Sequence, residues 1–354
     1  MGKTGASSAV EPNGPPGTGE TVVRSKAALW SLTLALTAAL VLGLGEGIAR
    51  MAHARAFSIS AAQYVGWAKP DPVLGWRNNP GVHPADEGAH EPMTILADGS
   101  RATGTPAGAG TTVLIVGCSF AEGYGVRDDE TFAWKLQQRF PELRIRDFGV
   151  PGYGTYQSLV LLREAMARQG IQPALVIYGF LPFHADRNVL TSSMLEAFRV
   201  FGGERFSPPH VEVRDGKLEA FPPFVVPAWP LEEQSALIAL LHQTELRVRL
   251  ANREKQRAEA TSLLLAQMNQ LVEGAHGRLL VATLWDGGPD PETYHRVTAD
   301  MRRAGIAQLN VTYAGAETRP EKILVGGTGH PGAIIHSWWA DKLGQWMVEQ
   351  GIAK

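Results

Sequence analysis

The stretch TVLIVGCSFAEGYGV, from Thr112 to Val126, decides the fold of this chain. Its first part, Thr112 to Val116, is a continuous run of apolar and β-branched residues, which is typical of a strand covered on both faces. Gly117, Cys118 and Ser119 follow at once. In open parallel α/β sheets, ligands bind beyond the carboxyl ends of the strands. We therefore expect Ser119 at the edge of a sheet where a functional site would lie.

Similar short apolar runs recur along the chain, and helical stretches separate them. The further predicted strands are residues 143–148, 174–178, 278–284 and 306–312. The predicted helices are residues 130–139 and 156–169, a long helix within 231–273, and residues 291–303 and 336–349. Continuous strands that alternate with helices predict an α/β fold, a three-layer α/β/α sandwich with a mainly parallel sheet.

Four segments are expected in the chain. Residues 1–26 are rich in Gly, Pro, Ser and Thr, which predicts a disordered cytoplasmic tail. Residues 27–45 (AALWSLTLALTAALVLGLG) carry no charge and are long enough to cross a hydrocarbon layer of about 30 Å as a transmembrane helix. Residues 46–110 are interpreted as a connector that packs on the domain. Residues 111–354 form the α/β domain, with a loop insertion at 191–230 around a hairpin turn at Asp215-Gly216.

The apolar segment 27–45 leaves three interpretations open: a membrane anchor, a cleaved signal peptide and a buried core helix. We favour the anchor, because a signal peptide usually has a shorter apolar region and a polar tail is an unusual neighbour for a core helix. The short tail precedes the span and the large domain follows it. The expected location is therefore the bacterial inner membrane, single-pass, with a cytoplasmic N-terminus and a periplasmic or otherwise extracytoplasmic domain.

Composition excludes several classes of function. The formal net charge is −2 and the charges are well mixed, so no basic field is available to hold nucleic acid. The single cysteine, Cys118, excludes an intrachain disulfide, and the histidines lack the spacing of metal ligands. We expect no metal and no cofactor. The sequence does not define an oligomeric state.

Three features could carry chemistry. Ser119 directly follows the first strand, where the amides of a following helix could face an oxyanion. A glycine loop, Gly149-Val-Pro-Gly152-Tyr-Gly154, follows the second strand and could supply a backbone N–H. His330 precedes the last helix and could act as a general base. Each feature alone also fits an ordinary helix cap, a flexible turn or an inert loop histidine.

Together and in this order, the three features resemble the SGNH (GDSL-like) hydrolase family, in particular its membrane-anchored bacterial branch. The resemblance covers roughly Asp71 to the C-terminus and runs through Gly117-Cys118-Ser119-Phe120, the glycine loop, the stretch after Gly179, and Thr328-Gly329-His330-Pro331. It implies a flavodoxin-like sandwich in which Ser119 is the nucleophile and His330 its base. It also implies that the amides of Ser119 and Gly149 bind the oxyanion.

The chain departs from the family pattern in three positions. Cys118 replaces the aspartate of the first motif. No asparagine follows Gly179 at the family spacing, so His184 or Asn188 would have to replace that oxyanion donor. Thr328 occupies the position of the aspartate that orients the histidine, and its loss can reduce turnover by about 10⁴ in a serine protease. Asp286 and Asp147 are candidate substitutes.

Two functions are therefore predicted. The first is a serine esterase or acyltransferase that acts through an acyl-serine on an O-acylated envelope glycan or lipid-linked sugar. The second is a catalytically weak or inactive module of the same fold that binds or assembles cell-surface polysaccharide. The intact Ser119, glycine loop and His330-Pro331 favour the enzyme, whereas Thr328 and the missing asparagine favour the module.

Overall fold

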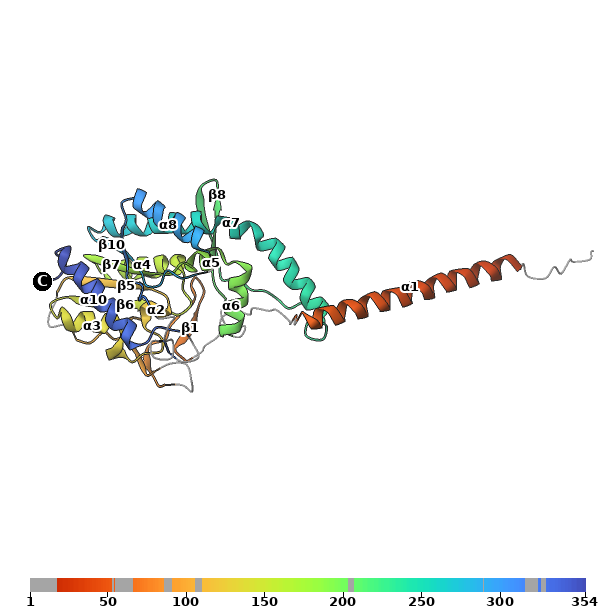
Figure 1. Ribbon diagram of the computed structural model, residues 1–354, viewed down its shortest axis with the longest axis horizontal. Helices are drawn as coiled ribbons and strands as arrows, with labels where there is room; N and C mark the ends of the chain where they lie inside the picture. Colours follow the sequence, from red (N-terminus) through yellow and green to blue (C-terminus); the bar gives the residue numbers. More distant parts are fainter. Residues whose placement is uncertain are drawn as a thin grey trace, which may run out of the picture. The chain divides into compact units, whose positions relative to one another are not determined.

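A computed structural model of the chain (Figure 1) describes residues 18–52, 54, 66–85, 91–105, 110–202, 207–288, 290–315, 324–325 and 329–354. The chain divides into two compact units. One consists of Met1–Ala56 with Trp229–His242, and the other consists of Phe57–Ala228 with Gln243–Lys354.

The larger unit is built on a five-stranded sheet in the order β11-β10-β7-β5-β6. All four pairings in this sheet are parallel. The strands are β5 (Thr112–Gly117), β6 (Arg144–Gly149), β7 (Leu175–Phe180), β10 (Arg278–Thr283) and β11 (Ala307–Asn310). The predicted α/β class and mainly parallel sheet are confirmed, and each strand lies within three residues of its predicted bounds.

Helices cover both faces of the sheet, as Figure 1 shows. Along β5, Val113 and Ile115 pack on one face, against residues of the helices α3 (Phe132–Arg139) and α10 (Ala333–Glu349). Leu114 and Val116 pack on the other face. The helices there are α4 (Thr155–Gln169), α7 (Ala236–Gly274) and α8 (Pro291–Arg303). The three-layer arrangement follows from this alternation of apolar residues with period two.

The segment before β5 forms two small antiparallel pairs. These are β1 (Ala68–Asp71) with β2 (Gly75–Asn78), and β3 (Gly81–His83) with β4 (Met93–Ile95). Trp76 of β2 packs in a third apolar cluster with Tyr153 and Phe198, and its indole N–H donates to the carbonyl of Pro151 at 2.8 Å. This segment therefore supports the glycine loop directly.

The segment 191–230 contains more regular structure than the predicted loop insertion. It begins with a helix, α6 (Ser192–Gly202), and continues with a hairpin of β8 (His210–Arg214) and β9 (Lys217–Phe221). Arg214 pairs with Lys217, so Asp215-Gly216 is the two-residue turn, as predicted. The sequence analysis missed α6, although Leu195 and Phe198, three residues apart on one face, are buried.

The smaller unit contains the helix α1 (Thr18–Met51). The helix begins within the segment predicted as a disordered tail and continues six residues beyond the predicted span, because no proline interrupts residues 17–51. Its part from Lys26 to Met51 is long and apolar enough to cross a membrane, and none of its most apolar window is buried within the protein. This exposure disfavours the core-helix interpretation.

Candidate active site

The turn that carries Ser119 follows β5 without any intervening loop. Gly117 ends the strand with φ of +155°, and a Cβ there would lie 2.9 Å from the carbonyl oxygen of Gly179. Cys118 is extended and caps α2 (Ser119–Glu122), so Ser119 is the first helical residue. A glycine is therefore required at position 117, because the turn brings β5 and β7 into close contact.

Ser119 lies at the point where the chain order of the sheet reverses. From β5, the next strand in the chain, β6, pairs on one side, and β7 pairs on the other side. Ligands in open α/β sheets bind at such a switch point, beyond the carboxyl ends of the strands. The Ser119 residue is 7% exposed, so it is largely shielded from solvent.

His330 lies within hydrogen-bond distance of Ser119. The distance between its Nε2 and the Oγ of Ser119 is 3.0 Å, although 211 positions separate the two residues in the chain. This is the separation that proton transfer from a serine to an imidazole requires. The proximity that the sequence analysis predicted is confirmed.

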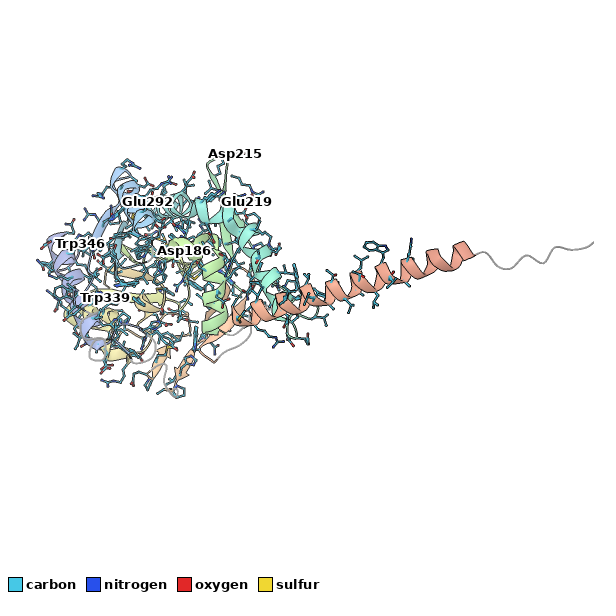
Figure 2. All side chains as sticks on the ribbon, turned by 45° about the vertical axis from the view of Figure 1, so that its right-hand side comes forward. Asp186, Asp215, Glu219, Glu292, Trp339 and Trp346 are labelled. Atoms are coloured by element: carbon cyan, nitrogen blue, oxygen red, sulfur yellow. The ribbon has the colours of Figure 1, made fainter. Side chains whose placement is uncertain are left out.

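Two aromatic rings pack against the imidazole of His330. Its ring centroid lies 4.9 Å from that of Tyr124 and 5.5 Å from that of Phe120. The backbone of the same loop is fixed, because the amide of Val325 donates to the carbonyl of His330 at 2.7 Å. Phe120 also stacks on Trp339 of α10, which Figure 2 labels. Aromatic packing therefore fixes the orientation of the base.

The glycine loop does not offer the amide that the resemblance implied. The N–H of Gly149 donates to Oδ1 of Asp147 at 2.8 Å. This N–H is therefore already engaged and does not point into the site as the expected oxyanion donor would. Gly152 has φ of +84° and faces Trp76, where a Cβ would clash at 2.8 Å. Gly154 caps α4, and its N–H is directed at the Gln157 side chain at 3.4 Å. These glycines shape a compact turn beside the nucleophile.

His184 and Asn188, the predicted substitutes for the missing asparagine, belong to a buried network. The Nδ1 of His184 is 2.7 Å from the Tyr178 hydroxyl, and burial holds the pKa of His184 well below its usual value. The Asn188 amide donates to the hydroxyls of Thr155 and Thr261 at 3.0 and 2.9 Å. Asn188 is therefore fully engaged in connecting α5 (His184–Val189) with α4 and α7, and it is not an oxyanion donor.

Arg187 is the charged residue of this region that the sequence analysis missed. Its Nη1 donates to the carbonyl of Tyr153 at 2.9 Å, and its guanidinium also interacts with the Cys118 side chain. The Phe183 ring lies 4.6 Å below the guanidinium carbon. Arg187 therefore joins the glycine loop to the residue that precedes the nucleophile. Its signal in the sequence was its position shortly after β7, in the third motif region.

The orienting acid of the histidine cannot be assigned to the two carboxylates suggested earlier. Asp286 accepts a hydrogen bond from the Asn310 side chain at 2.9 Å. Asp147 is fully buried and accepts the Gly149 amide. Both carboxylates are thus directed to other groups, and Thr328 lies outside the described residues.

Two buried carboxyl groups and one arginine lie behind the nucleophile turn. Burial raises the pKa of Glu122 to about 8 and that of Asp147 to about 7. Arg101 lies beside them and donates to the carbonyls of Glu122, Gly123 and Val126 at 2.6 to 2.9 Å. Because Glu122 follows Ser119 by three residues in α2, this cluster fixes the helix that carries the nucleophile.

Within the described ranges, no three His, Cys, Asp or Glu side chains are grouped as metal ligands would be. The site brings together a serine hydroxyl and an imidazole nitrogen at hydrogen-bond distance. Such a set can transfer an acyl group through a covalent serine intermediate.

No protein-family model and no curated protein matches the chain. The solved structures that it resembles include TesA, which is 14% identical with a TM-score of 0.40, the match covering 67% of this chain and 98% of TesA. A catalytic variant of Axe2, an acetylxylan esterase from Geobacillus stearothermophilus, is 12% identical with a TM-score of 0.37 and coverage of 68% and 94%. A member of the lipolytic G-D-S-L family from Veillonella parvula is 11% identical, with a TM-score of 0.36 and coverage of 66% and 95%.

Two of these neighbours are named for an activity or family of their own, as an acetylxylan esterase and as a member of the lipolytic G-D-S-L family. At these identities and TM-scores, the comparisons carry no argument about activity.

Proposed function

We propose that this protein is a membrane-anchored serine esterase or acyltransferase that acts through an acyl-serine intermediate. The observation that carries the proposal is the 3.0 Å separation of Ser119 Oγ and His330 Nε2 at the carboxyl end of β5. A serine hydroxyl is a weak nucleophile at neutral pH unless an adjacent base accepts its proton. This geometry supplies that base.

In the first half of the reaction, Ser119 Oγ attacks the ester carbonyl while His330 Nε2 accepts the hydroxyl proton. The imidazolium then returns this proton to the leaving alcohol as the ester C–O bond breaks, which leaves the acyl group on Ser119. In the second half, water or an acceptor hydroxyl attacks the acyl-serine and His330 takes its proton. The Ser119 bond to the acyl carbon then breaks, and the proton returns to Ser119.

The oxyanion is stabilised in this proposal by groups other than Gly149. The amide of Ser119 is in the first turn of α2, where N–H groups have no acceptor within the helix. The guanidinium of Arg187, beside Cys118, adds a fixed positive charge to the same region. Both groups belong to the framework before substrate binds, which is the condition for effective transition-state stabilisation.

We propose an O-acylated envelope glycan or lipid-linked sugar outside the cytoplasmic membrane as the substrate. The support is the helix α1, whose apolar part could hold the domain at the membrane surface. The substrate class itself rests on the family resemblance and on this location.

The alternative function is a non-catalytic module that binds envelope polysaccharide. The observation that favours it is the commitment of the Gly149 amide and of Asn188 to internal hydrogen bonds. Losing oxyanion donors reduces turnover, and removing one of them costs about 10²- to 10³-fold in a serine protease.

One assay on the full chain in detergent separates the two functions. The substrates are p-nitrophenyl acetate and an O-acetylated polysaccharide, and the variants are Ser119→Ala and His330→Gln. Matched controls are Ser193→Ala and His295→Gln, which change an exposed serine and an exposed histidine. If the protein is an esterase or acyltransferase, we expect only Ser119→Ala and His330→Gln to lose activity, by about 10³-fold or more. Polysaccharide binding without turnover in the unaltered chain would support the module.

A further inference from the structure

The turn before α7 is attached to the end of the apolar helix α1. The Glu46 carboxylate accepts hydrogen bonds from the Ser235 hydroxyl at 2.8 Å and from the amides of Ala236 and Leu237 at 3.1 and 3.0 Å. The side chain of Leu237 packs against Gly45, where a Cβ would lie 3.2 Å from it. A residue of α1 therefore caps the N-terminus of α7.

This attachment fixes the position of the turn along the axis of α1. The uncharged run of α1 ends at Gly45, and Arg50 Nη2 lies 3.5 Å from the carbonyl of Gln234. At about 1.5 Å of rise per residue, Gly45 and Arg50 are about 7.5 Å apart along the helix axis. That is close to the thickness of one polar headgroup layer, about 5–8 Å. If α1 spans a bilayer, the turn lies at the level of the headgroups.

The turn Trp229–Gln234, here called the apolar turn, is held in one conformation from within. The Glu232 carboxylate has no exposed surface, and it accepts hydrogen bonds from the Trp229 amide at 2.7 Å and from His242 Nδ1 at 2.9 Å. The Trp229 ring stacks on the His242 imidazole, with 4.8 Å between the centroids and 14° between the planes. The backbone amides of Gln234 and Ser235 both donate to the carbonyl of Leu231.

This ordered turn presents Trp229 and Leu231 outward, beside the exposed polar residues Glu233 and Gln234. Leu231 is 64% exposed and Trp229 is 39% exposed, and Leu241 in the second turn of α7 is 53% exposed. Leu231 also has φ of +65°, a left-handed backbone conformation that is strained for a residue with a Cβ. Exposing an apolar side chain to water is unfavourable, so it does not offset the strain of the Leu231 backbone. The strain would be offset if this side chain left water for an apolar environment.

We propose that the apolar turn inserts Trp229 and Leu231 into the headgroup region of the bilayer that α1 crosses, as a second membrane contact of this chain. The proposal rests on the membrane anchoring proposed above. Tryptophan is enriched at this level of a bilayer, because its ring is apolar and its N–H can remain hydrated. Arg50, which is ion-paired with Glu46 at 2.8 Å and has a side chain that is 65% exposed, places a cation beside the turn at the level of lipid phosphate.

The experiment uses the full chain in nanodiscs of phosphatidylcholine and phosphatidylglycerol, with one nitroxide spin label at a time. Cys118 is the only native cysteine and is fully buried, so the unaltered chain should take up no label, and this is checked first. Labels are placed at Leu231→Cys and Gln234→Cys in the turn. Leu36→Cys in the apolar run is the lipid reference, and Lys217→Cys in the exposed β-hairpin is the aqueous reference.

Power-saturation measurements with oxygen and with a water-soluble nickel chelate give the depth of each label. We expect the accessibility of Leu231→Cys to nickel to be several-fold lower than that of Lys217→Cys, and its depth to lie between those of the two references. A lipid-exposed Leu36→Cys together with turn labels as accessible as Lys217→Cys would overturn the membrane contact and leave the anchor standing. An aqueous Leu36→Cys would overturn the anchor itself, and the contact with it.

Discussion

Glu122 and Asp147 show how burial acts on single residues behind the nucleophile. Desolvation raises both pKa values, and the Arg101 charge opposes this shift only in part. A carboxyl group whose pKa is higher in the folded than in the unfolded protein favours folding most when both states are protonated. As the pH rises above the unfolded pKa, the unfolded chain releases its proton first, and the free energy of unfolding falls.

The corresponding prediction concerns the pH dependence of stability. We expect the free energy of unfolding to fall between about pH 4.5 and pH 8, because the folded protein retains the Glu122 proton over this window. Glu122→Gln should flatten this fall. Urea denaturation at several pH values measures it, with the exposed Glu219→Gln as the control. An unchanged slope in Glu122→Gln would contradict the assignment.

A second residue-scale prediction concerns Arg187. Arg187→Gln should keep the fold and reduce kcat more than it changes KM, because the lost charge would act on the transition state more than on bound substrate. We expect about 10- to 10²-fold, less than for the loss of Ser119. Arg187→Lys should recover part of kcat, since it restores the charge without the planar donor set. An increase in KM alone, with kcat unchanged, would assign Arg187 to substrate binding.

At the scale of elements, the nucleophile turn depends on the close approach of β5, α2 and β7. Gly117→Ala should destabilise the protein by about 1–3 kcal/mol, because the new Cβ would meet Ala121 and the Gly179 carbonyl in a backbone conformation that disfavours it. The rate of ester hydrolysis should fall by more than the smaller fraction of folded protein explains, since Ser119 is two residues away. Gly274→Ala is the matched control, because a Cβ there meets nothing within 4 Å. Equal effects of the two substitutions would count against this account of the turn.

The cap that Glu46 provides for α7 gives a prediction on a second element. Glu46→Ala should make the amides of Ala236 and Leu237 exchange their hydrogens several-fold faster, because they lose their acceptor. The neighbouring exposed residue Glu233 is the control, and Glu233→Ala should leave these amides unchanged. Hydrogen exchange followed by mass spectrometry reads this segment directly. Unchanged exchange in Glu46→Ala would mean that the cap does not hold in solution.

Sequence patterns predicted the central elements because those elements obey simple periodicities. The apolar runs of β5, β7 and β10 and the helices between them are visible locally. The pairs β1–β2 and β3–β4 were missed, because they are three or four residues long and are stabilised by packing on the rest of the domain. The helix α6 was missed because the phenylalanines and prolines that follow it resemble an irregular loop.

The candidate site was predictable in part, for a similar reason. Ser119 and His330 stand out through strand ends and glycines, and the fold places them in contact. The partner of the Gly149 amide could not be predicted, because it depends on the rotamer of Asp147 two residues away. Arg187 and Glu122 were missed, since their significance comes from burial, which a single sequence does not reveal.

At the scale of the whole molecule, the proposed membrane anchor predicts a topology that can be tested in cells. We expect a cysteine at Ser7 to be protected from a membrane-impermeant maleimide in intact cells, and a cysteine at Lys217 to be labelled. The physical reason is that, in the proposed anchor, the apolar part of α1 separates the tail from the domain. Permeabilised cells are the control, in which both positions should react. Labelling of both positions in intact cells would contradict an anchor with a cytoplasmic tail.

The most direct measurement of the central claim is the site at which a fluorophosphonate reacts with the full chain. We expect peptide mass spectrometry to find one phosphonyl adduct, on Ser119, and we expect His330→Gln to reduce its rate of formation by about 10³-fold or more. An adduct on another serine, or a folded protein in which Ser119 stays unmodified while a control serine hydrolase reacts, would contradict the claim that His330 activates Ser119.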